Sequence, residues 1–307
     1  MKIVFFGSGE FGRPTLESLH ASHEVQAIVT QPDRPAGRRR QLTATPIGQW
    51  AESTTPDTPL FKPENVNVDD VRDAIRAFDA DAWVIIAFGQ KLSPALLADR
   101  FAVNLHASLL PRWRGAAPIH RAIIAGDTVT GNSVITLADR MDAGLVLGQS
   151  HRPIEPAQTT GELHDLLAAD GPALVEQVLQ AHASGTLAPV EQDESAVTLA
   201  PKLSRTEAVM DWTEPAELCR AKINGLSPWP GVTIETASGA LKLLRADRAE
   251  ATDAAPGVVI DPAAGVIGCG DGAIRLVEVQ PAGKRGMPWG DFARGQQFEA
   301  GERIDAE

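Results

Sequence analysis

The stretch that decides the fold class reads Lys2-Ile3-Val4-Phe5-Phe6-Gly7-Ser8-Gly9-Glu10-Phe11-Gly12. Residues 2–6 form a short apolar run that Gly7 ends, and residues 14–20 then follow helical spacing. This order of strand, turn and helix is typical of doubly wound α/β domains. We therefore predict a doubly wound, Rossmann-like N-terminal domain.

The glycine-rich turn of residues 7–12 matches the fingerprint of dinucleotide-binding domains. A nicotinamide cofactor also requires an acidic residue at the end of the second strand, where it holds a ribose hydroxyl. The strand predicted at residues 25–29 is followed instead by Thr30, Gln31 and Pro32, and Asp33 lies beyond the proline. We therefore expect no NAD, and we interpret the turn as one that lets a helix approach a strand closely.

A second polar cluster follows the apolar residues 101–103. Asn104 and His106 are two positions apart, so on a strand their side chains emerge on the same face. The residues that come next predict a shaped loop at the carboxyl end of the strand, where open α/β sheets bind ligands; they are Ser108, Leu109, Leu110 and Pro111. Taken alone, an Asn-x-His pair more often caps a loop than catalyses a reaction.

A carboxylate that could complete this site lies in Met141-Asp142-Ala143-Gly144. If the two strand ends are neighbours, Asp142 can approach His106, and a nearby carboxylate favours the protonated imidazole and fixes its tautomer. An amide donor such as Asn104 then stands ready for a developing oxyanion. Phe88 and Gly89 form a further turn, after the buried strand predicted at residues 82–87, and this turn is either a ligand site or a plain strand-to-helix connection.

Residues 31–42 are too rich in Pro, Gly and Arg for regular structure, so we predict a long exposed loop. The loop contains Arg34, Arg38, Arg39 and Arg40, which form either a solvated charge run or a phosphate-binding surface. The formal net charge of the chain is −12. Because that charge opposes indiscriminate binding to nucleic acid, any RNA contact must use such a local basic patch.

The length of 307 residues and the hydrophobic content of 43% indicate two domains. We predict a first domain at residues 1–188, a linker at 189–206 and a smaller second domain at 207–307. The second domain contains five short predicted strands and an Asp271-Gly272 hairpin signal, which together suggest a small closed barrel. In the first domain, a helix predicted at residues 160–182 should break or kink at Gly171-Pro172.

Several kinds of site are not indicated. Cys219 and Cys269 stand alone, so we predict neither a disulfide nor a metal site and interpret both as packing residues. No apolar run approaches the roughly 20 residues that a membrane span requires, and no signal-peptide pattern is present. We expect a cytoplasmic protein, with no membrane partner, that acts as a monomer.

These motifs resemble those of the folate-dependent formyltransferases. The resemblance rests on Asn104-x-His106, residues 108–111, residues 112–119 and Met141-Asp142-x-Gly144. Residues 31–38, 201–204, 227–231 and 280–284 are similar to the family members that act on tRNA, so the likeness covers both predicted domains and the linker. One departure is Leu145, where the family often has proline.

The resemblance implies transfer of a formyl group from 10-formyltetrahydrofolate, as co-substrate, to the α-amino group of methionine on initiator tRNA, for translation initiation. It implies catalysis by Asn104, His106 and Asp142. It also implies an OB-like β-barrel as the second domain. The residues implied to contact folate are Ser108, Leu109, Leu110, Pro111, Phe88 and Gly89, and those implied to contact tRNA are Arg38, Arg39 and Arg40. Lys284 and Arg285 form either a solvated tip or a further contact with the tRNA backbone.

Three alternatives differ in what they require. Other formyltransferases of the family, acting on glycinamide ribonucleotide or an amino sugar, would share the catalytic residues but do not call for the arginine loop with an OB-like second domain. A non-catalytic RNA-binding module leaves Asn104, His106 and Asp142 without a purpose. A nicotinamide oxidoreductase lacks its ribose-binding carboxylate.

Overall fold

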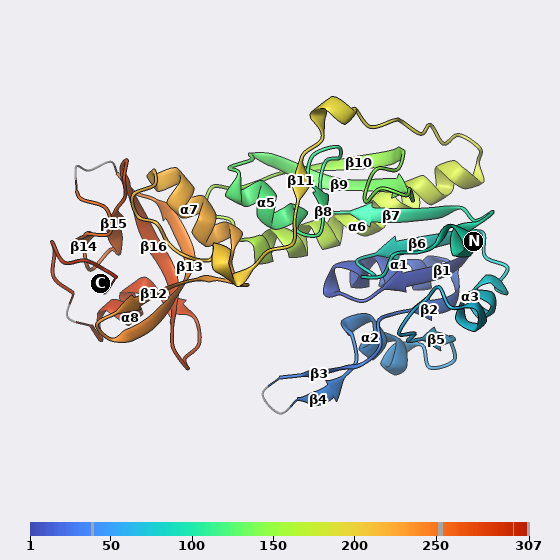
Figure 1. The fold of residues 1–307 in the computed structure, drawn as a ribbon, viewed down its shortest axis with the longest axis horizontal. Coiled ribbons are helices and arrows are strands. Elements are labelled where there is room, and N and C mark those ends of the chain that lie inside the picture. The colour runs from blue at the N-terminus through green and yellow to red at the C-terminus, as the bar shows by residue number, and fades with distance from the viewer. Residues whose placement is uncertain (38–39, 251–253, 297, 306–307) are drawn as a thin grey trace. The chain divides into compact units, whose positions relative to one another are not determined.

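The computed structural model describes residues 1–37, 40–250, 254–296 and 298–305 and forms two compact units (Figure 1). Unit 1 comprises Met1–Arg114, Gly131–His151 and Asp165–Thr198. Unit 2 comprises Gly115–Thr130, Arg152–His164 and Leu199–Glu307. The units interleave along the chain, and the domain boundaries at 188 and 206 stay a prediction.

Unit 1 is built on a seven-stranded sheet with the strand order β10-β9-β7-β6-β1-β2-β5. Pairs β1–β2, β1–β6 and β6–β7 are parallel, whereas β7–β9 is antiparallel, so the predicted Rossmann-like sheet is present but mixed. Strand order reverses between β1 and β6, the position at which such sheets bind ligands. The strands are β1 (Lys2–Gly7), β2 (Glu24–Val29), β5 (Leu60–Phe61), β6 (Ala82–Ile86), β7 (Ala102–His106), β9 (Val129–Thr136) and β10 (Val146–Pro153).

The central strands consist largely of apolar residues, and they are therefore buried. All five residues of β6 are buried, as are the last five of β1, which is expected for strands covered on both faces of the sheet. The Phe6 ring centroid lies 5.1 Å from that of Trp83 and 5.6 Å from that of Phe88. The Phe88 side chain therefore belongs to the core, and only its backbone is left for the turn after β6.

The glycine-rich turn at residues 7–12 brings a helix close to the sheet. A Cβ on Gly7 would lie 3.0 Å from the Ile86 carbonyl oxygen, and one on Gly12 would lie 3.2 Å from Ile86 Cβ. Ser8 Oγ donates a hydrogen bond of 3.0 Å to the Phe88 carbonyl and accepts one of 3.1 Å from the Gln31 amide. The close approach predicted for this turn is present, and its serine ties together the ends of β1, β2 and β6.

The helices predicted at residues 14–20 and 160–182 are present as α1 and α6, with one correction. Gly171-Pro172 does not break the helix, because α6 runs unbroken with Pro172 inside it, and the alternative of a kink stays a prediction. A Cβ on Gly171 would lie 2.8 Å from Leu105 Cδ2 and 2.9 Å from Thr15 Oγ1, so this glycine permits close packing of the helix. The helices of unit 1 are α1 (Arg13–Ser22), α2 (Pro46–Thr54), α3 (Asp69–Arg76) and α4 (Pro94–Leu97). Helix α6 (Thr160–Ala183) spans the boundary between the units. Two single turns, η1 (Glu10–Gly12) and η2 (Glu194–Ala196), also belong to unit 1.

The prediction of an irregular loop over residues 31–42 is wrong in part. The segment forms a small antiparallel hairpin of β3 (Arg34–Ala36) and β4 (Gln41–Thr43), which extends away from the seven-stranded sheet (Figure 1). Both strands are edges, so Pro35 does not interrupt a central ladder. Gly37 has a φ of 69° and suits the turn between them. Arg38 and Arg39 lie outside the described residues.

Unit 2 contains a six-stranded sheet ordered β12-β13-β16-β15-β14, with β17 also paired to β16. All five predicted strands are present, and the Asp271-Gly272 hairpin joins β15 to β16 as predicted. The strands are β12 (Val232–Thr236), β13 (Gly239–Arg248), β14 (Val259–Asp261), β15 (Val266–Gly268), β16 (Ala273–Pro281) and β17 (Met287–Pro288).

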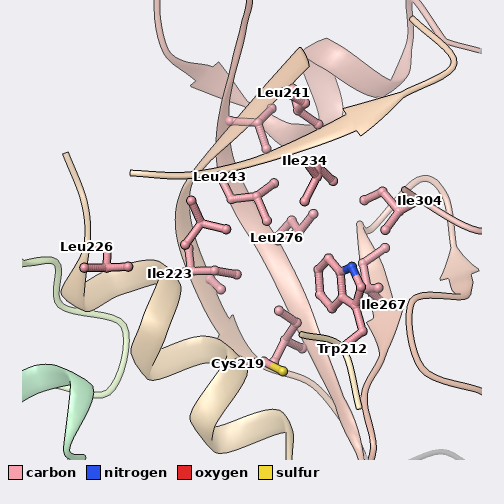
Figure 2. Packing of buried hydrophobic residues seen from close by; sticks show 14 of the residues in the cluster. Trp212, Cys219, Ile223, Leu226, Ile234, Leu241, Leu243, Ile267, Leu276 and Ile304 are labelled. Carbon is pink, nitrogen blue, oxygen red and sulfur yellow. The ribbon is translucent and has the colours of Figure 1, made fainter. Parts of the chain in front are cut away.

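The core of unit 2 lies between this sheet and helix α7. Figure 2 shows Cys219 and Ile223 of α7 facing Leu243 and Leu276 of the sheet. Cys219 is 1% exposed and Cys269 is 3% exposed, which confirms both as packing residues. The helices of unit 2 are α5 (Pro118–Ile124), α7 (Ala216–Gly225), α8 (Trp289–Ala293) and η3 (Arg205–Glu207). Two short strands, β8 (Arg114–Gly115) and β11 (Leu199–Ala200), lie where the chain passes between the units.

Within the described ranges, no helix is both long enough and apolar enough to cross a lipid bilayer.

Candidate active site

Asn104 and His106 both lie on β7, at its carboxyl end. Asn104 is paired through the backbone with Ile85 of β6 and Ile135 of β9, and His106 is paired with Ser133 of β9. Their spacing of two residues on a strand puts both side chains on one face of the sheet, as predicted. His106 is buried, with 7% of its surface exposed, and Asn104 is half-buried.

The expected approach of Asp142 to His106 is present, because Asp142 Oδ2 lies 3.6 Å from His106 Nδ1. The two side chains are 13% and 7% exposed. The assumption of neighbouring strand ends is wrong, since β9 is antiparallel to β7 and Thr136 at its end pairs with Val103. Residues 137–145 therefore turn back to bring Asp142 to the imidazole.

The backbone of this returning segment is tightly constrained. Asp142 has a φ of 53°, in the left-handed region that residues with a Cβ rarely adopt. A Cβ on Gly144 would lie 1.7 Å from the Thr136 carbonyl oxygen, so only glycine fits there. Leu145, at the position where the family often has proline, donates its backbone N–H to Thr136 Oγ1 at 2.9 Å. A proline could not make this bond, yet the carboxylate of Asp142 still reaches His106.

The second ring nitrogen of His106 contacts the main chain. His106 Nε2 lies 2.9 Å from the Trp113 carbonyl oxygen. Because a carbonyl only accepts hydrogen bonds, Nε2 must carry the hydrogen, and Nδ1 is the nitrogen that faces Asp142. The Nδ1 edge of the ring therefore faces Asp142 while Nε2 keeps the contact with Trp113.

Three polar side chains hold the loop of residues 108–111 in shape. Ser133 Oγ accepts a hydrogen bond of 3.0 Å from the Leu110 amide and donates one of 2.6 Å to the Ser108 carbonyl. Gln149 Nε2 donates to the Leu110 carbonyl at 2.9 Å, and Ser108 Oγ donates to the Arg112 carbonyl at 2.6 Å. Our sequence analysis missed Ser133 and Gln149, which are polar residues within the segments that form β9 and β10.

The turn of Phe88 and Gly89 is also held by side chains. The Phe88 carbonyl accepts from Gln31 Nε2 at 3.1 Å as well as from Ser8, and Gly89 has a φ of 87°. Since β6 and β7 are parallel neighbours, this turn and the loop of residues 108–111 leave the same edge of the sheet. The structure thus brings the two predicted folate-contacting segments to one edge.

Three of the basic residues predicted to contact tRNA lie within the described ranges, and each is on the surface of its own unit. Arg40, at the start of the turn into β4, is exposed, and Lys284 and Arg285 are exposed after β16. Gly283 has a φ of 72°, and the Lys284 amide donates to the Pro281 carbonyl at 3.0 Å, so this pair occupies a tight turn.

Comparison with known proteins identifies two family matches. Residues 1–179 match the model described as formyl transferase, and residues 202–297 match the formyl transferase C-terminal domain. The methionyl-tRNA formyltransferase of Methylobacterium nodulans is 42% identical over 99% of both chains. That of Thiobacillus denitrificans is 40% identical over 100% of both chains.

Solved structures support the same fold at low sequence identity. An N-formyltransferase from Helicobacter canadensis, in complex with folinic acid and dTDP-3-aminofucose, has a TM-score of 0.67 and 12% identity, covering 90% of this chain and 99% of its own. HypX from Aquifex aeolicus, in complex with tetrahydrofolic acid, has a TM-score of 0.63 and 18% identity, covering 95% of this chain and 46% of its own.

Proposed function

The chain belongs to the formyl transferase family, and we propose that it transfers a formyl group from 10-formyltetrahydrofolate to the α-amino group of methionine on initiator tRNA. The product is N-formylmethionyl-tRNA. Full-length relatives of 40–42% identity that carry the name methionyl-tRNA formyltransferase support this acceptor. The observation that carries the chemistry is the distance of 3.6 Å between His106 Nδ1 and Asp142 Oδ2, beside Asn104 on β7.

The reaction makes three chemical demands. The attacking amine must be neutral, the formyl oxygen gains negative charge, and the folate nitrogen leaves poorly unless it is protonated. Asn104 donates its side-chain amide to the developing oxyanion, and His106, on the same face of β7, helps to hold that oxygen. Asp142 holds His106 and accepts the proton of the amine, directly or through water. As the bond between the formyl carbon and the folate nitrogen breaks, this proton passes to that nitrogen, so the folate leaves as the neutral amine.

The surroundings of His106 suit this role. The Trp113 carbonyl fixes the ring through Nε2, so the Nδ1 edge is the one that faces Asp142. Both side chains are largely buried, and electrostatic interactions are stronger where water is excluded. No enzyme nucleophile is needed, because the substrate amine itself attacks the formyl carbon.

The folate co-substrate binds at the edge of the sheet where β6 and β7 end. Phe88 and Gly89 contribute backbone groups, and the four residues of the following loop complete the surface; they are Ser108, Leu109, Leu110 and Pro111. The hydrogen bonds of Ser133 and Gln149 support this assignment, because they hold the loop in one conformation before any ligand binds. The proposed reaction uses neither a metal nor NAD.

The tRNA contacts lie on local basic patches. Arg40, with Arg38 and Arg39 beside it in sequence, and the pair Lys284 and Arg285 bind phosphates, which position an RNA without reading its bases.

The sheet of unit 2 is an OB-like barrel in this proposal. Register shifts in β13 between Leu243 and Ala246 support it, since bulges of this kind bend a strand and help a sheet to close. The enzyme acts as a monomer in the cytoplasm.

An amino-sugar acceptor is the closest alternative within the family. Structural neighbours include the dTDP-3-aminofucose complex, so the fold alone does not separate the two acceptors. The β3–β4 hairpin with its arginines and the relatives at 40–42% identity over the full length favour tRNA as the acceptor.

Purified protein should be supplied with formylated folate and, in separate reactions, initiator Met-tRNA, elongator Met-tRNA and an amino-sugar nucleotide. We expect N-formylmethionine from the initiator tRNA. Formylation of the sugar nucleotide with neither RNA modified would replace the proposed acceptor.

A further inference from the structure

A segment beyond the predicted first domain contacts both Asp142 and Trp113, the two residues that lie against the His106 ring. Residues 190–198, which we term the strap, belong to unit 1. Val190 forms two backbone hydrogen bonds with Val146, of 2.8 and 2.9 Å, which align the strap beside the start of β10. Sequence analysis placed these residues in a linker, where no role in the site is expected.

Within the strap, Gln192 holds the backbone around Asp142. Its Nε2 atom donates one hydrogen bond of 2.8 Å to the Asp142 carbonyl and another of 2.8 Å to the Gly144 carbonyl. An amide nitrogen has two hydrogens, so both are used on this turn. Asp142 is the residue in the left-handed conformation, with a φ of 53°, and Gln192 is bonded to its own carbonyl.

Gln192 is itself fixed by charged neighbours. Its Oε1 atom accepts a hydrogen bond of 2.9 Å from Nε of Arg114, whose side chain is 5% exposed. Arg114 also pairs with Glu194 at 3.0 Å, and Arg140 pairs with the same carboxylate at 2.9 Å. Hydrogen bonds from Arg140 and Arg114 hold the pKa of Glu194 below its ordinary value, so it remains charged near neutral pH.

The other end of the strap is hydrogen-bonded to Trp113, whose carbonyl contacts His106 on the Nε2 side. Thr198 Oγ1 accepts a hydrogen bond of 2.9 Å from the Trp113 amide, and the Thr198 carbonyl accepts one of 2.9 Å from the Arg114 amide. Trp113 has a φ of 63°, so it too is in the left-handed region. The strap thus supports both unusual backbone positions that flank the imidazole.

We infer that Gln192 is a positioning residue for formyl transfer: its two hydrogen bonds keep Asp142 in the left-handed conformation that places the carboxylate beside His106. This inference rests on the proposed function. Gln192 acts through Asp142, so its loss should lower kcat while the KM for either substrate changes little. A residue that only stabilised the fold would lower the amount of folded enzyme and leave kcat per folded molecule unchanged.

The test variant is Gln192→Glu, which keeps the size of the side chain and the contact with Arg114 but cannot donate to the two carbonyls. We expect kcat to fall about 10- to 100-fold, because small displacements of a catalytic group have effects of that size. The matched control is Gln49→Glu, since Gln49 is exposed on α2 and its amide also donates to a carbonyl, that of Ala44. The control should keep wild-type kcat.

A double-mutant cycle tests whether Gln192 acts through Asp142 or independently of it. In an Asp142→Asn background, Gln192→Glu should cause almost no further loss of kcat, because the carboxylate that Gln192 positions is already gone. A loss as large as that in the wild-type background would overturn the inference.

A crystal structure of the Gln192→Glu variant gives a readout that does not depend on the acceptor. We expect Asp142 to leave the left-handed region and its carboxylate to move away from His106. Retention of both features would overturn the inference, as would unchanged kcat. If the wild-type enzyme leaves Met-tRNA unformylated, the proposed function fails, and the conformation of Asp142 in the variant still decides the role of Gln192.

Discussion

His106 Nδ1 and Asp142 Oδ2 lie 3.6 Å apart although His106 ends β7 and Asp142 follows β9, which runs in the opposite direction. The contact depends on the turn at residues 137–145, with Asp142 at a φ of 53° and a glycine at 144. A carboxylate held there can accept the proton that the amine must lose during acyl transfer.

Replacement of Asp142 by Asn should lower turnover about 100-fold or more, because removal of one group that stabilises such a transition state typically costs about 3 kcal/mol. The side chain is nearly the same size, so the fold should be retained. Steady-state formylation measures the effect, and circular dichroism with thermal unfolding serves as the control. Wild-type turnover in this variant would exclude Asp142 from the mechanism.

Asn104→Ala should reduce kcat by a similar factor, about 100-fold, since it deletes a donor to the oxyanion. Asn104 is half-buried at the end of β7, and the truncation leaves the backbone pairing with Ile85 and Ile135 intact. Comparison of kcat with KM shows whether Asn104 stabilises the oxyanion or binds the ground-state substrate. A rise in KM with unchanged kcat would mean that Asn104 binds the ground state and does not stabilise the oxyanion.

The site could be predicted from sequence where it depends on local spacing. Asn104 and His106 share a face because strands have a period of two residues, and this needs no knowledge of the rest of the chain. The approach of Asp142 was predicted from its motif, but the topological assumption was wrong, because single-sequence patterns do not reveal the direction of β9 relative to β7.

Long-range hydrogen bonds were beyond the sequence analysis. Gln192 contacts residues 50 and 48 positions earlier, and Ser133 contacts a loop about 25 positions earlier. No periodicity encodes such pairs. The same limit explains the continuous helix α6, in which packing against Leu105 and Thr15 outweighs the local tendency of Pro172 to break the helix.

Ser133→Ala should destabilise unit 1 by about 1–3 kcal/mol, because it removes the hydroxyl bonded to the buried Leu110 amide and Ser108 carbonyl. The loop of residues 108–111 should loosen, so the KM for the folate substrate should rise more than kcat falls. Urea unfolding and kinetics measure the two effects. Ser53→Ala, at an exposed hydroxyl on α2, is the control. Equal stability and equal KM in both variants would contradict this account of the loop.

The stability of unit 2 should depend on pH through His120. Burial lowers the pKa of His120, the Trp229 carbonyl opposes that effect, and the nearby charges of Arg121 and His164 add to it. Since the folded pKa lies below the unfolded value of about 6.5, the unfolded state binds more protons, and stability rises with pH. The full stability is present above about pH 6.5 and falls as the pH drops towards the folded pKa.

Urea unfolding at several values from about pH 5 to about pH 8 measures this dependence. His120→Gln should flatten the part of the profile just below the unfolded pKa of about 6.5, leaving the losses at lower pH that come from carboxylates. An identical slope in the variant and the wild type would assign the dependence to other groups.

The central claim is that this site moves a formyl group onto the amine of methionyl-tRNA with the aid of Asp142. Transfer of an isotopically labelled formyl carbon from 10-formyltetrahydrofolate to initiator Met-tRNA, measured by mass spectrometry for the wild type and Asp142→Asn side by side, tests it most directly. We predict labelled N-formylmethionine from the wild type and a rate lower by about 100-fold or more from the variant. Absence of label in the methionine of the wild-type reaction, or equal rates from the two proteins, would contradict it.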